Sequence, residues 1–373
     1  MEKRHDAQNH AQTVNKLDLY ILKKFIGTFF FAVGLLMMII IVFDLSENID
    51  SFLRHNAPWQ RVVTDHYLTS IPYFTNQFIH LFVFISVIFF TSKMANHSEV
   101  VAVLSSGISF WRFLRPYVAG AVMLALMSLY FSNFMIPNMN EIRRRFKDEY
   151  IEHLTKSSGA NLHFQTGKDE FVYVSMYDLN RDLGYKFSVE RYDGNELVYK
   201  MASDVIYHEP DGEHHWRIDF ATQRYIDGDR ERIENARTID TIIENLTPGD
   251  FYNMKEDFEE MNFFELRDHI GGMRERGVEG VRQYEVEMHQ RMAQPVAILI
   301  LTLIGAALSS RRIKGGMGMH LGVGIAIGFS YVLIGQVAKA FGVNGVVSPV
   351  IAAWIPNIIY ALLAAFFLKR APK

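Results

Sequence analysis

The sequence contains no cysteine among its 373 residues. Disulfide bonds, catalytic thiolates and cysteine-ligated metals are therefore excluded. A strong charge of one sign is also lacking: the formal net charge is −3, without the basic field that attracts nucleic acid. The pairs His208-Glu209 and His214-His215 do not have the spacing of a metal site. We therefore expect no metal, no cofactor and no nucleic-acid partner.

The motifs of several enzyme classes are missing as well. The sequence has no GxxxxGK[ST] loop to hold ATP phosphates, no HExxH zinc-protease motif and no GxSxG nucleophile elbow. We therefore predict that the chain is not an enzyme and does not bind ATP itself.

Long apolar runs are present instead. Apolar residues make up 49% of the chain and charged residues 21%, and the two groups are segregated along the sequence. Six runs are each long enough to cross a hydrocarbon layer of about 30 Å. None of them contains Asp or Glu, which argues against an ion- or proton-coupled carrier. The six runs are 25–43, 67–90, 117–136, 292–308, 317–341 and 348–368, and Pro116 and Pro137 are expected to bracket the third.

The segment between the third and fourth runs is polar. Residues 138–156 are predicted to be helical, and from about residue 160 the apolar period changes to two, which is typical of strands. A helix is expected again over 262–276. The strands are expected at 171–174, 185–189, 197–201, 203–208, 216–220 and 238–243, with Asp-Gly turns at 193–194, 211–212 and 227–228.

This pattern predicts an α-helical integral membrane protein with six transmembrane helices (3+3) and an inserted β-jellyroll-like domain, an antiparallel sandwich or jelly roll. The expected domains are an N-terminal transmembrane half at 1–137, a β domain with flanking helices at 138–290 and a C-terminal transmembrane half at 291–373.

The distribution of Lys and Arg predicts the orientation in the membrane. With the N-terminus inside, the inner segments carry fourteen of these residues and the short outer loops only two. The cluster Arg143, Arg144, Arg145 and Lys147 would lie outside, but it belongs to a long translocated segment, where the rule is weak. We therefore expect cytoplasmic termini and an outer, periplasmic β domain.

One polar stretch, 97–115, joins the second and third runs on the predicted inner side. Val100, Val101, Leu104 and Ile108 have helical spacing, and Ser98 is a candidate N-cap with Glu99 in the first turn. We predict a short surface helix at about 97–109. The alternative is a turn that happens to be helical.

Two further groups stand out near the membrane. The fifth run contains overlapping GxxxG spacings at Gly318, Gly322, Gly324 and Gly328, which indicate close helix packing or a moving contact such as a gate. Arg291 and Lys339 are expected at the outer interface, where a cation either contacts an anionic lipid headgroup or simply extends to water.

These features resemble the LptF/LptG (YjgP/YjgQ) family of lipopolysaccharide export permeases. Three spans, a β domain and three spans follow in that order over about 17–373. The resemblance is carried by the sequences Ser98-Glu99-Val100-Val101-Ala102, Ser106-Gly107-Ile108-Ser109, Arg291-Met292-Ala293-Gln294-Pro295 and Ala353-Trp354-Ile355-Pro356-Asn357.

The resemblance implies a permease subunit of an ABC-type exporter in the inner membrane of a Gram-negative bacterium. It would pair with a second LptF/LptG-type permease, be driven by a cytoplasmic LptB ATPase dimer, and pass lipopolysaccharide through an LptC-like membrane-anchored protein to a periplasmic bridge. The first and fifth spans would form lateral gates, which include the four glycines above. The ATPase-coupling residues would be Ser98, Glu99, Ala102, Val103, Ser106 and Gly107.

The chain departs from the family at one place. Family members can carry lysines near the outer end of the first span, where this sequence has Asp44, Glu47 and Asp50. The cations for a lipid phosphate would then come from Arg291, Lys339 or the paired subunit. Two alternative functions are a permease for another envelope lipid or lipoprotein, and a membrane-anchored scaffold.

Overall fold

The computed structural model describes the residues 2–151, 162–167, 169–178, 181–194, 196–209, 214–228, 230–243, 246–251, 258–275, 280–311 and 316–371. The chain forms two compact units, residues 1–146 together with 285–373, and residues 147–284. We call them the helical unit and the β unit.

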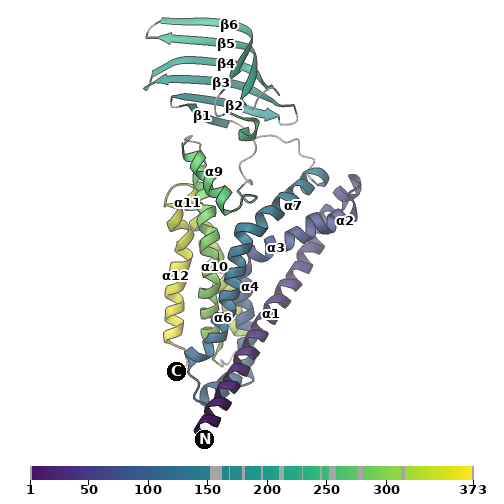
Figure 1. The fold of residues 1–373 in the computed structure, drawn as a ribbon, viewed down its shortest axis with the longest axis vertical. Helices are drawn as coiled ribbons and strands as arrows, with labels where there is room; N and C mark the ends of the chain where they lie inside the picture. Colours follow the sequence, from purple (N-terminus) through teal and green to yellow (C-terminus); the bar gives the residue numbers. More distant parts are fainter. Residues whose placement is uncertain are drawn as a thin grey trace. The chain divides into compact units, whose positions relative to one another are not determined.

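The helical unit contains six helices that are long and apolar enough to span a membrane, among the residues that are described (Figure 1). The predicted arrangement of three spans, a β insert and three spans is confirmed. The spans lie in α1 (Glu2–Arg54), α4 (Ile79–Asn96), α6 (Phe110–Tyr130) with its continuation, α10 (Val281–Ser309), α11 (Gly316–Val343) and α12 (Pro349–Lys369).

The second span differs from the predicted run 67–90. The structure has a one-turn helix α2 (Trp59–Arg61), a π-helix η1 (Val62–Tyr67) and α3 (Leu68–Gln77), and the chain then bends at Phe78 before α4. The bend follows polar Asn76, which is 6% exposed and accepts a hydrogen bond of 2.6 Å from Ser128 of α6. The prediction rested on a run without charged residues, and such a run can be either straight or bent. Asn76 does not end the run because it is uncharged, and its buried amide is tolerated among apolar residues since it has a hydrogen-bond partner.

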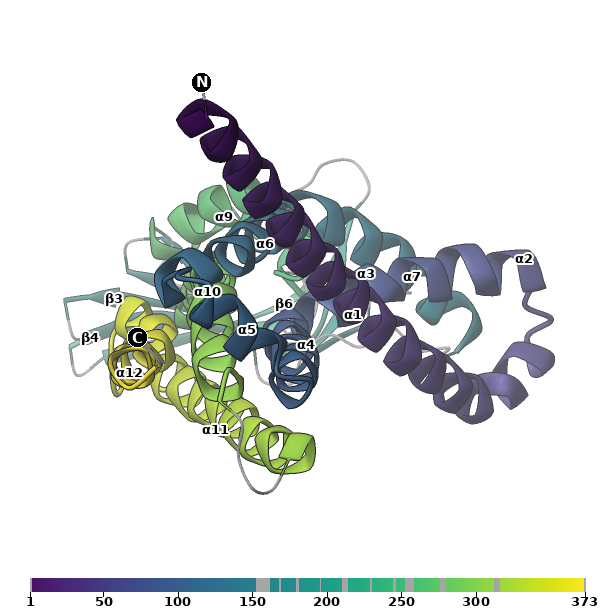
Figure 2. The same ribbon diagram turned by 90° about the horizontal axis from the view of Figure 1, so that it is seen from below.

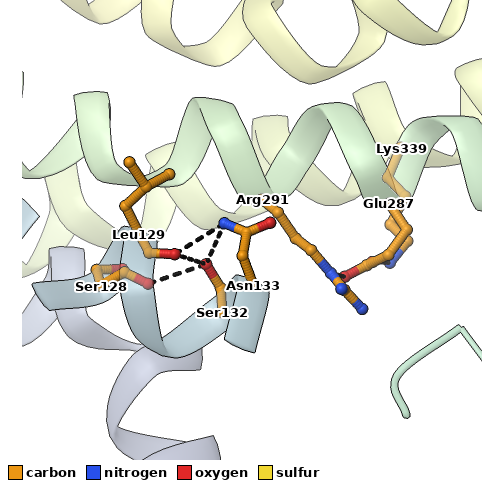
Figure 3. A network of polar contacts seen from close by, with 7 residues as sticks. All are labelled: Ser128, Leu129, Ser132, Asn133, Glu287, Arg291 and Lys339. Atoms are coloured by element: carbon orange, nitrogen blue, oxygen red, sulfur yellow. Dashed lines mark hydrogen bonds and ion pairs between the residues drawn. The ribbon is translucent and has the colours of Figure 1, made fainter. Parts of the chain in front are cut away.

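The third span is also longer than predicted, because neither proline ends it. Pro116 lies inside α6, and the helix continues through a π-helix η2 (Phe131–Met135) into α7 (Ile136–Tyr150). Pro137 has no N–H, so the backbone must adjust one turn earlier. Side chains there bond the local carbonyls: Ser132 Oγ donates to Ser128 O at 2.9 Å and Asn133 Nδ2 to Leu129 O at 2.8 Å (Figure 3).

The core of the helical unit is aromatic. The rings of Phe25 and Phe90 lie 5.9 Å apart, and those of Phe90 and Tyr117 lie 5.2 Å apart, so α1, α4 and α6 meet at one stack. Thr91 and the Tyr117 hydroxyl share a hydrogen bond of 2.9 Å. Offset rings and a satisfied hydroxyl suit a water-free interior.

The β unit is built on one antiparallel sheet of six strands. The strand order β1-β2-β3-β4-β5-β6 follows the chain, so each strand pairs with its neighbours in sequence. This order was not predictable from the alternation alone. The strands are β1 (Leu162–Gly167), β2 (Glu170–Asp178), β3 (Leu183–Asp193), β4 (Glu196–His208), β5 (His215–Asp227) and β6 (Arg230–Ile242).

The inward face of this sheet changes phase along a line that crosses its central strands. Buried residues in β5 are Trp216, Ile218 and then Ala221, so the inward-facing alternation changes phase at Phe220. Phe220 has φ of +55°, and Lys186 at the same level of β3 has φ of +50°. Ladder pairing skips both residues on their β4 sides, but the register is the same before and after each of them, so no residue is inserted relative to β4.

This change of phase explains two errors in the predicted strands. The single strand β4 was predicted as two, 197–201 and 203–208, because its burial phase changes between Ser203 and Ile206. The prediction for β5 stopped at residue 220, where the alternation fails. The strand β1 was missed, and the predicted turn 211–212 lies outside the described residues.

The core of the β unit lies on one face of the sheet. Tyr177 stacks on Phe251 with ring centroids 4.2 Å apart, and Trp216 Nε1 donates to Leu246 O at 3.2 Å. On the other side of the β3–β4 pair, Lys200 donates to Glu190 Oε1 at 2.7 Å, and this bond lowers the pKa of Glu190. The helix predicted at 262–276 is α9 (Phe263–Glu275).

Candidate functional site

The connection between α4 and α6 contains the predicted surface helix in a shorter form. It is α5 (Glu99–Ser105), and Figure 2 shows it joining the ends of its two neighbours. Val100 is fully buried, and Val103 and Leu104 pack against the helical core. The opposite face is open, with Val101, Ala102, Ser105, Ser106 and Gly107 exposed. The helix is thus amphipathic, with a small, mostly uncharged outer surface.

The prediction that the Ser98 side chain caps this helix is wrong. Ser98 has φ of +60° and its side chain caps no backbone N–H. The left-handed residue instead turns the chain sharply out of α4, with Ser98 N bonded to Ala95 O at 3.1 Å. At the other end, Gly107 has φ of +87°, which its lack of a Cβ allows. Two tight turns therefore hold α5 against the bundle.

Polar bonds join this connection to α1. The Tyr20 hydroxyl donates to Glu99 Oε2 at 3.3 Å. Arg112, at the start of α6, holds both carboxylate oxygens of Asp18 at 2.8 and 2.6 Å. A bidentate pair restricts direction as well as distance. Sequence reasoning missed Asp18 and Arg112, because no local spacing links residues 94 positions apart.

A further hydrogen bond joins this end of the helical unit to α11. Ser92, near the end of α4, shares a hydrogen bond of 2.7 Å with His320 Nδ1, and both residues are buried. His320 is thus a packed histidine, as is His80, whose ring lies 5.1 Å from that of Tyr331. Both α1 and α11 are therefore tied to the helices that flank α5.

The four predicted glycines divide into two pairs. A Cβ on Gly324 would lie 2.2 Å from Ile88 Cδ1, and one on Gly328 would lie 2.6 Å from Leu81 Cδ1, so both pack tightly on α4. Around Gly318 and Gly322 a Cβ would meet nothing within 4 Å. The second pair lies on a face of α11 that this chain leaves uncovered, together with Val323, Ala326 and Phe329.

The predicted cations meet at a carboxylate that the sequence analysis did not single out. Glu287 accepts from Arg291 Nε at 3.3 Å and from Lys339 Nζ at 3.4 Å, so that one side chain links α10 to α11 (Figure 3). Arg291 is only 5% exposed. The i,i+4 spacing of Glu287 and Arg291 was a visible signal, whereas the approach of Lys339 required the fold.

Two of the sequences that carried the resemblance also meet. Asn357 Nδ2 donates to Ala293 O at 2.8 Å, and its Oδ1 accepts from the Tyr331 hydroxyl at 3.0 Å. Asn357 is 2% exposed, and the bonded carbonyl lies two residues before Pro295 in α10. One amide thereby joins α10, α11 and α12 at a place where a proline disturbs the helix ladder.

The acidic residues near the outer end of α1 are partly engaged within the chain. Asp44 Oδ2 lies 2.8 Å from Nε2 of His66, which is 2% exposed, in the π-helix η1. The Asn48 side chain donates to the Asp44 carbonyl at 3.1 Å. Asp44 thus stabilises the α1–η1 contact.

Comparisons with known proteins agree with these features. A family model described as "Lipopolysaccharide export system permease LptF/LptG" matches residues 19–370. The chain is 20% identical over 312 residues to the lipopolysaccharide export system permease protein LptG of Escherichia coli K12, covering 81% of this chain and 84% of that protein. It is 21% identical over 366 residues to LptG of Haemophilus influenzae, covering 96% of this chain and 99% of that protein.

Proposed function

Because the chain belongs to the LptF/LptG family and is a multi-pass lipopolysaccharide export permease subunit of the inner membrane, we propose that its α5 connection is the docking surface for a cytoplasmic LptB ATPase dimer. The observation that carries this proposal is the exposed face of α5 next to Glu99, in a chain without a phosphate-binding loop. A small and nearly uncharged surface of this kind fits a complementary groove.

Motion of α5 would reach α1 through two contacts. Glu99 bonds Tyr20, and Arg112 holds Asp18, so a force on the connection is passed to the inner end of α1. The Ser92–His320 bond offers a parallel route to α11. These are the two helices that would form the lateral gates with a paired LptF/LptG-type permease.

The burial of the spans supports this pairing surface. In α1 and α11, only 22% of the apolar 18-residue stretch that could span a membrane is buried inside the chain. The corresponding share is 72% for α4 and 67% for α10. The open apolar faces of α1 and α11 need lipid or protein cover, since water does not solvate them. Gly318 and Gly322 would allow a partner backbone to approach α11 closely.

The orientation completes the proposal. The termini and α5 would be cytoplasmic, and the β unit would be periplasmic and pass lipid toward an LptC-like protein and the periplasmic bridge. Arg291 and Lys339, near the opposite end of the bundle from α5, would contact the lipid headgroup. The excess of Lys and Arg in the segments on the α5 side supports this assignment.

Co-purification with the ATPase tests the docking surface. Glu99→Lys should reduce the retained ATPase at least several-fold, because it reverses the charge at the edge of the docking face. Tyr20→Phe is the matched control: it removes the bond to Glu99 within the chain and leaves the docking face intact, so ATPase retention should stay at the wild-type level. Equal retention by Glu99→Lys and wild type would show that α5 does not dock the ATPase through Glu99.

A further inference from the structure

Arg291, Glu287 and Lys339 form a compact charged cluster at the α10–α11 contact (Figure 3). The Arg291 side chain is 6% exposed, that of Glu287 20% and that of Lys339 34%, so the cluster opens toward Lys339. One carboxylate, Glu287, thus bridges two cations at a place that is reachable from the Lys339 side.

Close helix packing builds this cluster. A Cβ on Gly342 would lie 2.9 Å from Val286 Cγ2, so α11 approaches α10 within one turn of Lys339 and beside Glu287. The same Cβ would lie 2.6 Å from the Cβ of Ala352, which fixes α12 there as well. Lys339 is thus held within reach of Glu287 by the backbone.

The carboxylate has a clear electrostatic role. Removing a guanidinium from water is costly, and the ion pair with Glu287 offsets part of that cost for Arg291. A phosphate could take over this role, since Arg and Lys bind phosphate oxygens with geometry similar to that for a carboxylate.

We propose that Glu287 is an internal counter-ion that holds Arg291 and Lys339 when no lipid is bound, and that the phosphate of an anionic lipid headgroup displaces it. This inference rests on the proposed headgroup contact of the two cations. The exchange replaces one anion by another, so the net cost of emptying the site stays low and the lipid can leave again.

The exchange also has a mechanical consequence. Glu287 and Arg291 lie on the same helix, whereas the bond from Lys339 to Glu287 crosses from α11 to α10. Displacing Glu287 breaks this cross-helix bond. Headgroup binding and release of the outer end of α11, one of the two proposed gate helices, are then a single event.

Lipid binding by the full-length chain, in nanodiscs with its co-purifying subunits, tests the inference. Glu287→Gln keeps the side-chain shape and removes the competing charge. The Kd for phosphorylated lipid A, the membrane anchor of lipopolysaccharide, should fall about tenfold, within the range typical of coupled sites. The Kd for dephosphorylated lipid A should not change. Glu47→Gln removes an exposed carboxylate at the outer end of α1 and should leave both values unchanged.

Two further variants separate the possible failures. If Arg291→Gln weakens binding of phosphorylated lipid A but Glu287→Gln leaves it unchanged, the headgroup contact stands and the counter-ion role is overturned. If neither Arg291→Gln nor Lys339→Gln affects binding, the headgroup contact itself is wrong. Should Glu287→Gln fail to assemble, Glu287→Asp shortens the bridge and should give a smaller decrease in Kd; an unchanged Kd there would equally contradict the inference.

Discussion

At the scale of single residues, buried polar side chains join helices to one another by hydrogen bonds. Asn357, Ser128 and His320 each bond another helix from a position that is almost fully buried. In an apolar interior such groups are costly unless they are paired, so each pair also specifies which helices are neighbours. The Glu287 cluster differs from these pairs because it is charged and partly open.

Close packing at glycine gives a prediction at this scale. Gly342→Ala places a methyl group 2.6 Å from the Cβ of Ala352, which cannot rotate away, so α12 must shift. We expect a loss of roughly 1–3 kcal/mol, typical of overpacking. It would appear as a lower midpoint of thermal unfolding for the purified chain.

Gly322→Ala is the matched control for this substitution. Its Cβ would meet nothing within 4 Å, and alanine favours a helix more than glycine does. The unfolding midpoint should stay or rise. A decrease as large as that of Gly342→Ala would contradict the packing described for α11. Loss of export with unchanged stability would instead locate a partner contact at Gly322.

At the scale of elements, irregular backbone marks the places that sequence patterns do not reveal. The π-helices η1 and η2 interrupt helical stretches, and Lys186 and Phe220, which have positive φ, interrupt the regular geometry of β3 and β5. In the π-helices the hydrogen bonds shift by one residue, and in the strands the inward-facing side shifts by one residue while the ladder register stays the same. A one-residue adjustment reverses the phase of a period-two pattern, which is why strand bounds were less predictable than strand existence.

The positive φ of Lys186 in β3 gives a prediction for the β unit. Lys186 is exposed and has a left-handed φ that a side chain disfavours by about 1 kcal/mol. Lys186→Gly should therefore increase hydrogen-exchange protection of the β3 and β4 amides. Asp204→Gly, on the neighbouring exposed position of β4 without a positive φ, should decrease it. The opposite ranking would show that the backbone at Lys186 is not strained.

At the scale of the whole molecule, the absence of cysteine makes orientation directly measurable. Thr222→Cys, exposed on β5, and Lys369→Cys, exposed at the end of α12, each introduce a single thiol. A membrane-impermeant maleimide should label Thr222→Cys in intact spheroplasts. It should label Lys369→Cys only after the membrane is broken. Labelling of both thiols in intact spheroplasts would contradict the proposed orientation, since it requires the β unit and the C-terminus on opposite sides.

The sequence by itself determined the number of spans, the β insert between them and the family, because apolar runs, alternation and short motifs are local properties of the chain. Only the tertiary structure decided the contacts between distant residues, such as Asp18 with Arg112 and Lys339 with Glu287. It also showed that α5 has one open face, and that Gly322 faces outward while Gly324 faces α4. The physical reason is that a repeating pattern specifies which face of a helix is apolar, whereas the neighbour of that face depends on how all helices pack together.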